Sequence, residues 1–300
     1  MSNNIGSSSE FFLANMRRLD ERIGVTERQI SSGKRVSLAS DAPEQVSEIV
    51  NARGELRRLE QIRRNLELAQ SEVDTAEHSL QTGVKILERL RTIAIQAAGD
   101  AQTAEVRATL GVEVGVLLDR LVGIAAARHG GRYVFSGDND RTAPYSIDLT
   151  QPNGVSAYAG GVDTRQLEHP SGFRFSLSRN AQDIFESNTG QNIFEAVNAF
   201  RIALETNDVP AVQASIPTLQ DAHEELSDTL SLYGSYQRTI RDAVEFTIQK
   251  ELRQKVVLGT LEDTDIAEAA ITLTRARSDR EAAYSARART PRTSLFDYLG

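Results

Sequence analysis

The chain has 300 residues, 40% hydrophobic but only 6% aromatic, with no Cys, no Trp, two Met and a net charge of -8. The absence of Cys excludes disulfides, thiolate metal sites and cysteine nucleophiles. The acidic balance argues against a surface built wholly for nucleic acid or anionic lipid. No run of eighteen apolar residues occurs and residues 1–30 show no cleavable secretory signal, so we expect no membrane span and no signal peptide of that kind. The apolar residues are mostly Ala, Leu, Val and Ile, which favours a helical protein.

The first predicted element in chain order is a short amphipathic segment within residues 1–42. It carries apolar residues at coiled-coil spacing, with little else in the segment to bury them against. We therefore expect it to pack on another part of the chain or on a neighbouring subunit. Its apolar residues are Leu13, Met16, Leu19, Ile23 and Ile30.

A long helical arm is predicted over residues 43–129. Between residues 52 and 99, apolar or small residues recur every seven positions in two series, which is typical of a long helix packed along another at a shallow angle. Asp41 is predicted to cap this helix with Pro43 in its first turn, Gly99 to end it, and a further helix to follow over about 104–128. The two series are Leu59, Leu66, Val73, Leu80, Leu87 and Ala94, and Ile62, Ala69, Ala76, Gly83, Leu90 and Ala97.

The composition changes over residues 130–190, which hold eight of the twenty Gly and seven of the seventeen aromatic residues. Residues 133–135, 145–149, 155–158 and 173–177 are rich in β-formers, and Pro152-Asn153-Gly154 is a hairpin turn signal. We predict a small β-rich insertion domain here.

Helix returns over a second arm, residues 191–261, and a terminal segment, residues 262–300. The arm has a seam through Val212, Leu219, Leu226, Tyr233 and Ile240, offset from Val209, Ile216, Leu230, Val244 and Leu258. The predicted fold is mainly α: a long antiparallel helical hairpin or coiled-coil bundle formed by the two arms, with a small β domain at its tip. Both termini then meet at the other end.

Several motifs resemble those of the bacterial flagellin family. Residues 29–36 (Gln-Ile-Ser-Ser-Gly-Lys-Arg-Val) and 39–43 (Ala-Ser-Asp-Ala-Pro) are similar to its N-terminal signature, and residues 261–269 to its C-terminal signature. Within the family, residues 131–137 and the tail over 294–299 are more similar to the hook-associated members at the hook-filament junction than to flagellin proper. Ala42 departs from the family pattern, which usually has a second Asp there.

The resemblance implies a structural subunit of the bacterial flagellum and not an enzyme. It implies an adaptor at the hook-filament junction that assembles through its N- and C-terminal helices, which are poorly ordered in the monomer over about 1–40 and 262–300. It implies self-assembly into a ring, contact with a hook-side adaptor protein and with filament flagellin, and a flagellar export chaperone at the C-terminal segment. It also implies an extracellular location reached by type III flagellar export, with no nucleic-acid or membrane partner.

Contacts between subunits are expected at the amphipathic ends of the chain. Two alternatives stay open: flagellin or a minor filament subunit, and, from another class, a coiled-coil signalling or scaffold module with the insertion as a sensor. The predicted interface residues are Leu13, Met16, Leu19, Ile23, Ile30, Ile266, Leu273, Leu295, Phe296 and Leu299.

The sequence offers no catalytic, cofactor or metal site. His78, His129, His169 and His223 are dispersed and lack partners at metal-ligand spacing. Residues 138–140 (Asp-Asn-Asp) begin like a calcium loop, but the Gly and Glu that such a loop needs are missing, so we expect a turn. Six arginines between residues 275 and 292 are expected to contact a subunit or a chaperone rather than nucleic acid.

Overall fold

The structure is a computed structural model that describes residues 3–99, 101–163, 166–176, 178–186 and 192–289. The chain divides into two compact units. The first unit consists of Met1–Arg58 and Glu251–Gly300, and the second is Leu59–Lys250. The two longest helices, α2 (Val46–Ala97) and α6 (Val209–Glu262), contribute to both units. The division into five segments made from the sequence is finer than these units and stays a prediction.

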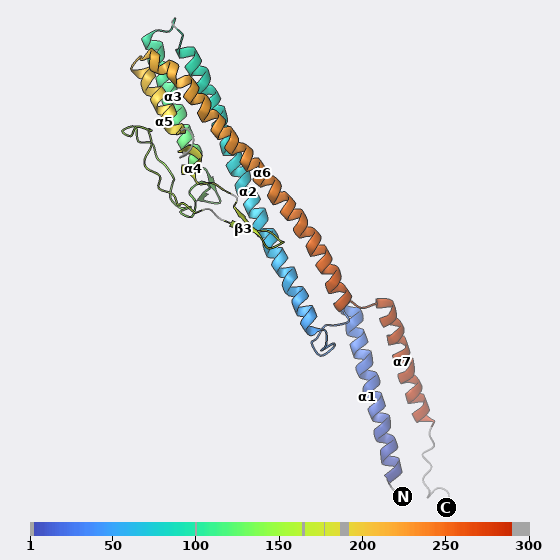
Figure 1. Ribbon diagram of the computed structural model, residues 1–300. Coiled ribbons are helices and arrows are strands. Elements are labelled where there is room, and N and C mark those ends of the chain that lie inside the picture. The colour runs from blue at the N-terminus through green and yellow to red at the C-terminus, as the bar shows by residue number, and fades with distance from the viewer. Residues whose placement is uncertain (1–2, 100, 164–165, 177, 187–191, 290–300) are drawn as a thin grey trace, which may run out of the picture. The chain divides into compact units, whose positions relative to one another are not determined.

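The second unit is built on an antiparallel pairing of α2 with α6. Gln237 of α6 donates its side-chain amide to Asp74 Oδ1 (2.8 Å) and Glu77 Oε2 (2.6 Å) of α2. Further along α2, Gly83 faces the Leu226 side chain of α6. A later residue of α2 thus contacts an earlier residue of α6, so the two helices run antiparallel. Two shorter helices, α3 (Ala104–Ala125) and α5 (Ile193–Glu205), pack on each other beside this pair (Figure 1).

The heptad seam predicted on α2 is confirmed, because the members of both of its series are buried. On α6 the first predicted series is buried as well, with Val212, Leu219, Leu226, Tyr233 and Ile240 all at 0% exposure. The second predicted series is displaced by one residue: its members within this unit are half-buried, and the buried positions carry small or hydroxyl side chains. These are Ser215, Ala222, Thr229 and Ala243.

A buried arginine closes the turn between α2 and α3. The Arg107 side chain, from the first turn of α3, is 5% exposed and donates to the carbonyl oxygens of Ala97 (2.9 Å) and Gly99 (3.1 Å) at the end of α2. It also donates to Asn207 Oδ1 (2.9 Å) in the connection from α5 to α6. One side chain thus satisfies the last carbonyls of α2 and ties both turns at this end of the bundle.

The insertion contains little regular β structure in its described residues. Two short antiparallel pairs occur, β1 (Arg128–His129) with β2 (Arg132–Tyr133), and β3 (Gln166–Glu168) with β4 (Arg174–Ser176), followed by the short helix α4 (Ala181–Phe185). The strands expected over 145–149 and 155–158 are reduced to a single bridge, Ile147 to Val155. Phe135, Tyr145 and Val155 are instead buried in the helical core, so packing against helices replaces pairing between strands.

The expected place of the insertion at the tip of the hairpin is wrong. His129 Nδ1 lies 3.1 Å from Thr75 Oγ1, near the middle of α2. Phe135 packs edge-to-face on Tyr233 of α6, with 6.1 Å between ring centroids. The tip is formed by the turns that Arg107 ties together, because α3 folds back along the bundle before the insertion begins (Figure 1).

The first unit contains the terminal helices α1 (Asn3–Ser32) and α7 (Ile266–Ala288), together with the start of α2 and the end of α6. Gln254 of α6 donates its side-chain amide to the Ala52 carbonyl of α2 (3.2 Å), which joins these two helix ends. The predicted meeting of the two ends of the chain is confirmed by the contacts between α1 and α7. Their poor order in an isolated monomer stays a prediction.

Candidate functional site

Helices α1 and α7 pack antiparallel along one narrow seam. On α1 the seam is formed by Met16, Ile23 and Thr26, each at most 6% exposed. On α7 it is formed by Ala269 and Ala276, seven residues apart like Met16 and Ile23. Because α7 contributes alanines to the seam, little apolar area is buried there. Further contacts between the two helices include an edge-to-face contact of Phe12 with Tyr284, with 6.4 Å between ring centroids.

Two ion pairs run along one edge of this seam. Arg277 Nη2 lies 2.7 Å from Glu27 Oε1, and Arg280 Nη1 lies 3.2 Å from Asp20 Oδ1. These side chains are 36–56% exposed, and such exposed pairs contribute only about 0–1 kcal/mol each. Their role is to fix the register of the two helices. Arg287 also bonds within the chain, to Ser9 Oγ (2.7 Å), so at least three of the six arginines expected to contact a partner contact α1 instead.

The connector from α1 to α2 meets the connector from α6 to α7 through backbone hydrogen bonds. The amides of Arg35 and Val36 both donate to the Glu262 carbonyl (2.6 and 3.2 Å), and the Thr264 amide donates to the Gly33 carbonyl (3.0 Å). Gly33 has φ 68°, in the left-handed region that favours glycine. These residues belong to the two terminal motifs of the sequence analysis, which the fold therefore brings together in one joint.

The side chain of Glu262 is the buried charge of this joint. Glu262 is 1% exposed, and its carboxylate accepts from Lys34 Nζ (2.8 Å) and Arg53 Nε (2.5 Å). Burial alone would raise the pKa of Glu262, but the hydrogen bonds from Arg53 and Lys34 and their positive charges outweigh it and lower the pKa. The carboxylate is therefore ionised at neutral pH and links α6 to both the connector and α2.

A small apolar cluster packs beside the joint. Val36, Ala42 and Ile49 are buried, and Leu258 and Leu261 of α6 pack against them. Ala42 is 2% exposed in this cluster, where a second Asp would place a charge among apolar side chains. The departure of the chain from the family pattern at this position thus fits its own packing.

The capping role predicted for Asp41 is wrong. Helix α2 begins at Val46, and Asp41 Oδ2 instead accepts from the amides of Ser37 (3.0 Å) and Leu38 (2.7 Å) within the connector. These two backbone hydrogen bonds lower the pKa of Asp41. An Asp carboxylate can accept hydrogen bonds from the backbone amides of a turn as well as from those at a helix N-terminus, and Asp41 bonds to a turn. Asp265 does cap a helix, since its carboxylate accepts from two amides in the first turn of α7.

The structure separates the predicted interface residues by exposure. Leu13 and Ile266 are exposed, at 55% and 56%, and are available to a second molecule. Met16 and Ile23 are buried in the seam between α1 and α7, so they act within the chain.

The other predicted interface residues fall into two groups. Those half-buried on α1 and α7 are Leu19, Ile30 and Leu273. Those outside the described residues are Leu295, Phe296 and Leu299.

Further exposed apolar residues of the first unit were missed by the sequence analysis. Phe11 on α1 is 69% exposed, and Ile271 and Tyr284 on α7 are 53% and 56% exposed. On α6, Leu252 and Val256 are 58% and 67% exposed and lie four residues apart, on one face of the helix. The i, i+4 spacing of Leu252 and Val256 is present in the sequence, but it was overlooked because the apolar residues of α6 were all assigned to one buried seam.

Residues 138–140 were considered from the sequence as the start of a calcium loop. Residues 138–140 form the expected turn, in which the Tyr133 amide donates to the Asp140 carbonyl (2.8 Å) and Arg132 pairs with the Asp140 carboxylate (3.1 Å). Within the described ranges, no group of three or more His, Asp or Glu is placed to hold a metal ion. The described helices also include none long and apolar enough to cross a bilayer.

Comparison of the sequence with known proteins identifies flagellins. The family model of the bacterial flagellin N-terminal helical region matches residues 4–140. Flagellin B of Helicobacter pylori strain J99 is 27% identical over 217 residues, which are 69% of this chain and 42% of that protein. The chain therefore spans less than half the length of this relative. The resemblance to the flagellin family inferred from the terminal motifs is confirmed.

Comparison with solved structures identifies hook-associated proteins. A Vibrio parahaemolyticus protein assigned as a flagellar hook-associated protein has a TM-score of 0.66 at 19% identity, covering 74% of this chain and 100% of that one. Flagellar hook associated protein-3 of Legionella pneumophila has a TM-score of 0.63 at 16% identity, covering 71% and 98%. The chain thus shares the fold of these proteins, and the predicted mainly α fold is confirmed.

Proposed function

We propose that this chain is a structural subunit of the bacterial flagellum that acts as the adaptor at the hook-filament junction, in the manner of hook-associated protein 3. Its N-terminal region resembles that of flagellins, and its fold is that of hook-associated proteins. Those relatives are filament and hook-associated proteins, which supports a structural role rather than an enzymatic one.

The observation that carries this proposal is the joint around Glu262. It brings the two terminal motifs together and leads directly into α1 and α7, so both ends of the chain leave the joint as one helical pair. A subunit that assembles through its termini needs such an arrangement, because a single contact surface then contains both ends.

The exposed apolar side chains of the first unit favour assembly. The seam between α1 and α7 buries few large side chains, while Leu13 and Ile266 stay in water. Isolated pairs of this kind are marginal, and they gain stability when exposed apolar groups are covered by neighbouring copies. We therefore propose that α1 and α7 are poorly ordered in the monomer and become stable on assembly.

The same contacts would cover further three residues that are half-buried in the single chain: Leu19, Ile30 and Leu273. We propose that Leu295, Phe296 and Leu299 also contribute to contacts between subunits.

The partners follow from the proposed position. The subunit would form a ring with its own copies, with a hook-side adaptor protein on one side and filament flagellin on the other. We propose that a flagellar export chaperone holds the C-terminal segment before export. The chain would reach the flagellum outside the cell by type III export, and would bind neither nucleic acid nor membrane.

A second candidate is a filament subunit. It is favoured by the sequence relatives, since the first of them are flagellins rather than hook-associated proteins. The two functions differ in copy number, because a junction ring needs few copies and a filament needs a great many.

Deletion and complementation in the source organism test the proposal. Without the gene, hooks should lack filaments, and filament subunits should appear in the medium. The wild-type gene should restore filaments, and a Leu13→Asp, Ile266→Asp double variant should not, because the charges would lie on the contact surface. Leu149→Asp is a matched control, since Leu149 is 54% exposed but lies in the insertion. Normal filaments on hooks in the deletion strain would refute the junction role.

A further inference from the structure

The α2 seam is recessed at one level within the second unit. Leu66 and Leu80 are fully buried on this helix, but the three buried positions between them carry the smaller residues Ala69, Val73 and Ala76. Small side chains at consecutive seam positions leave a volume that a Leu would fill. The recess lies where the insertion covers α2, so the insertion closes over a gap instead of a packed surface.

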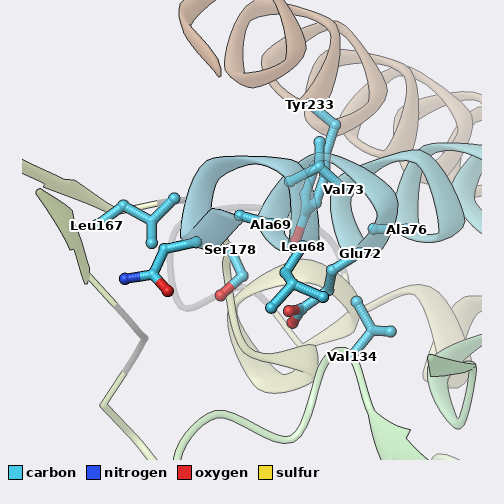
Figure 2. Close-up of a pocket in the computed structure, with 10 residues that line it drawn as sticks. Leu68, Ala69, Glu72, Val73, Ala76, Val134, Leu167, Ser178 and Tyr233 are labelled. Atoms are coloured by element: carbon cyan, nitrogen blue, oxygen red, sulfur yellow. The ribbon is translucent and has the colours of Figure 1, made fainter. Parts of the chain in front are cut away.

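This recess is a cavity of about 200 Å³. Its walls come from several separate segments, as Figure 2 shows: Val134 follows β2, Leu167 lies on β3, and Tyr233 lies on α6. Carbon atoms dominate these walls. The rest of the lining is contributed by α2 and by Ser178.

The walls are held in place by contacts that do not involve the cavity. The Tyr233 hydroxyl accepts from the Arg179 amide (3.1 Å), and its ring packs edge-to-face on Phe135, so Tyr233 cannot swing in to fill the space. The Val134 amide donates to the Ala127 carbonyl (2.9 Å). The cavity is therefore preformed, and a ligand would not have to open it.

The polar groups of the lining restrict what can bind. Asn65 and Ser178 offer amide and hydroxyl groups, and the Glu72 carboxylate points among the lining side chains (Figure 2). The negative charge of Glu72 disfavours an anion in such apolar surroundings. Leu68, also in the lining, is 67% exposed, so a bound apolar ring would cover part of it.

We propose that this cavity is a binding site for a neutral one-ring aromatic compound that carries a hydroxyl group, such as phenol or benzyl alcohol. An apolar protein cavity of about 150 Å³ is large enough for benzene, and a cavity of about 200 Å³ has room for a ring with one substituent. The ring covers the small side chains of α2, and its hydroxyl group bonds to the polar side chains in the lining. This property goes beyond the proposed flagellar function and does not depend on it.

Titration of the full chain with phenol, followed by methyl NMR, tests the proposal. Saturable shifts are expected at the methyl groups of Leu68, Val73, Val134 and Leu167, and benzoate should produce none. Ala76→Leu fills the cavity and should weaken phenol binding at least about tenfold. Ala69→Leu is a second filling variant that serves if the first fails to fold. Ala108→Leu, at an exposed position on α3, is the control and should bind phenol like the wild type.

Several results would overturn the proposal. These are the absence of saturable shifts with phenol, equal binding of benzoate, or unchanged phenol binding in a folded filling variant. Loss of binding in the exposed control would also contradict it, because the effect would then not come from the cavity.

Discussion

Replacing Glu262 by Gln tests whether one buried carboxylate holds the joint together. The substitution keeps the shape of the side chain and removes its charge. The two hydrogen bonds from Lys34 and Arg53 are charge-assisted, and such bonds are worth about 1.5–3 kcal/mol each, or about 3–6 kcal/mol together. The donor side chains are 44% and 46% exposed and regain water when released, so we halve this sum and expect a loss of about 2 kcal/mol.

Amide hydrogen exchange reads out this loss locally, where a melting curve would mix both units. The Arg35 and Thr264 amides bond across the joint and report its opening. A loss of about 2 kcal/mol should speed their exchange about 30-fold, since 1.4 kcal/mol corresponds to tenfold. Asp263→Asn is the matched control, because it removes a neighbouring exposed charge. If exchange changes less than threefold in Glu262→Gln, or by the same factor in Asp263→Asn, the Glu262 carboxylate does not hold the joint together.

The same variant predicts a change in the pH dependence of the joint. The folded-state pKa of Glu262 lies below its ordinary value of 4.5, so its contribution to stability is fully present above that value. The contribution is lost as the pH falls toward the folded-state pKa. Wild-type exchange at the Arg35 amide, corrected for its intrinsic rate, should therefore accelerate below about pH 4.5, and Glu262→Gln should lose this dependence. An identical pH profile in the two proteins would contradict the assignment.

Three further substitutions follow from the packing. Because α1 is proposed to be poorly ordered in the monomer, its amides should retain only weak protection from exchange. Met16→Ala should remove most of that remaining protection, since it deletes a buried side chain worth about 1–2 kcal/mol, whereas Leu13→Ala should leave it unchanged. Arg107→Leu should lower the free energy of unfolding of the second unit by about 2–4 kcal/mol, measured by urea unfolding. The Ala97 and Gly99 carbonyls and Asn207 Oδ1 would each lose a hydrogen-bond donor. Gly137→Ala should destabilise the same unit by more than about 1 kcal/mol, since φ is 61° and a Cβ would overlap the Gly161 carbonyl.

Each of these predictions has a result that would contradict it. Equal exchange in Met16→Ala and Leu13→Ala would mean that the seam does not hold α1. An unchanged urea midpoint in Arg107→Leu would mean that water replaces the guanidinium at no cost. Gly130→Ala is the control for Gly137→Ala, because φ at Gly130 is 56° and a Cβ added there would meet nothing within 4 Å. Equal losses at both glycines would show that only the backbone angle matters, not the crowding.

The long helices were predictable because their apolar spacing is regular over many turns. On α2 the members of both predicted series are buried, since Leu, Val, Ile and Ala mark the seam directly. On α6 the second series was displaced because Ser215 and Thr229 occupy buried positions. The Ser215 hydroxyl donates to the Ala211 carbonyl of its own helix, so this polar residue is tolerated in the seam.

The insertion was less predictable because its structure depends on contacts made elsewhere in the chain. Propensity suggested strands, but Phe135 and Tyr145 are better buried in the helical core than paired in a sheet. The insertion lies against the middle of α2 because α3 folds back along the bundle. The predicted hairpin had treated α3 as a continuation of the first arm.

The segments that form the joint were identified from their sequence motifs, but the contacts between them were not predictable. The terminal signatures identified the segments that contain Gly33 and Glu262, while nothing in the sequence showed that Arg53 would complete the pairing of Glu262. A salt bridge between distant segments has no local pattern. The exposed positions of Leu13 and Ile266 were included in the predicted interface, but their separation from buried Met16 and Ile23 required the packing of α1 on α7.

The location of the protein in the flagellum distinguishes a junction subunit from a filament subunit. Antibodies against the second unit, applied to isolated intact flagella and viewed by electron microscopy with gold particles, report where the subunit lies. A junction subunit should give a single cluster of gold between hook and filament on each flagellum, and none in the deletion strain. Gold along the whole filament, or no gold on flagella that contain both hook and filament, would contradict the junction role.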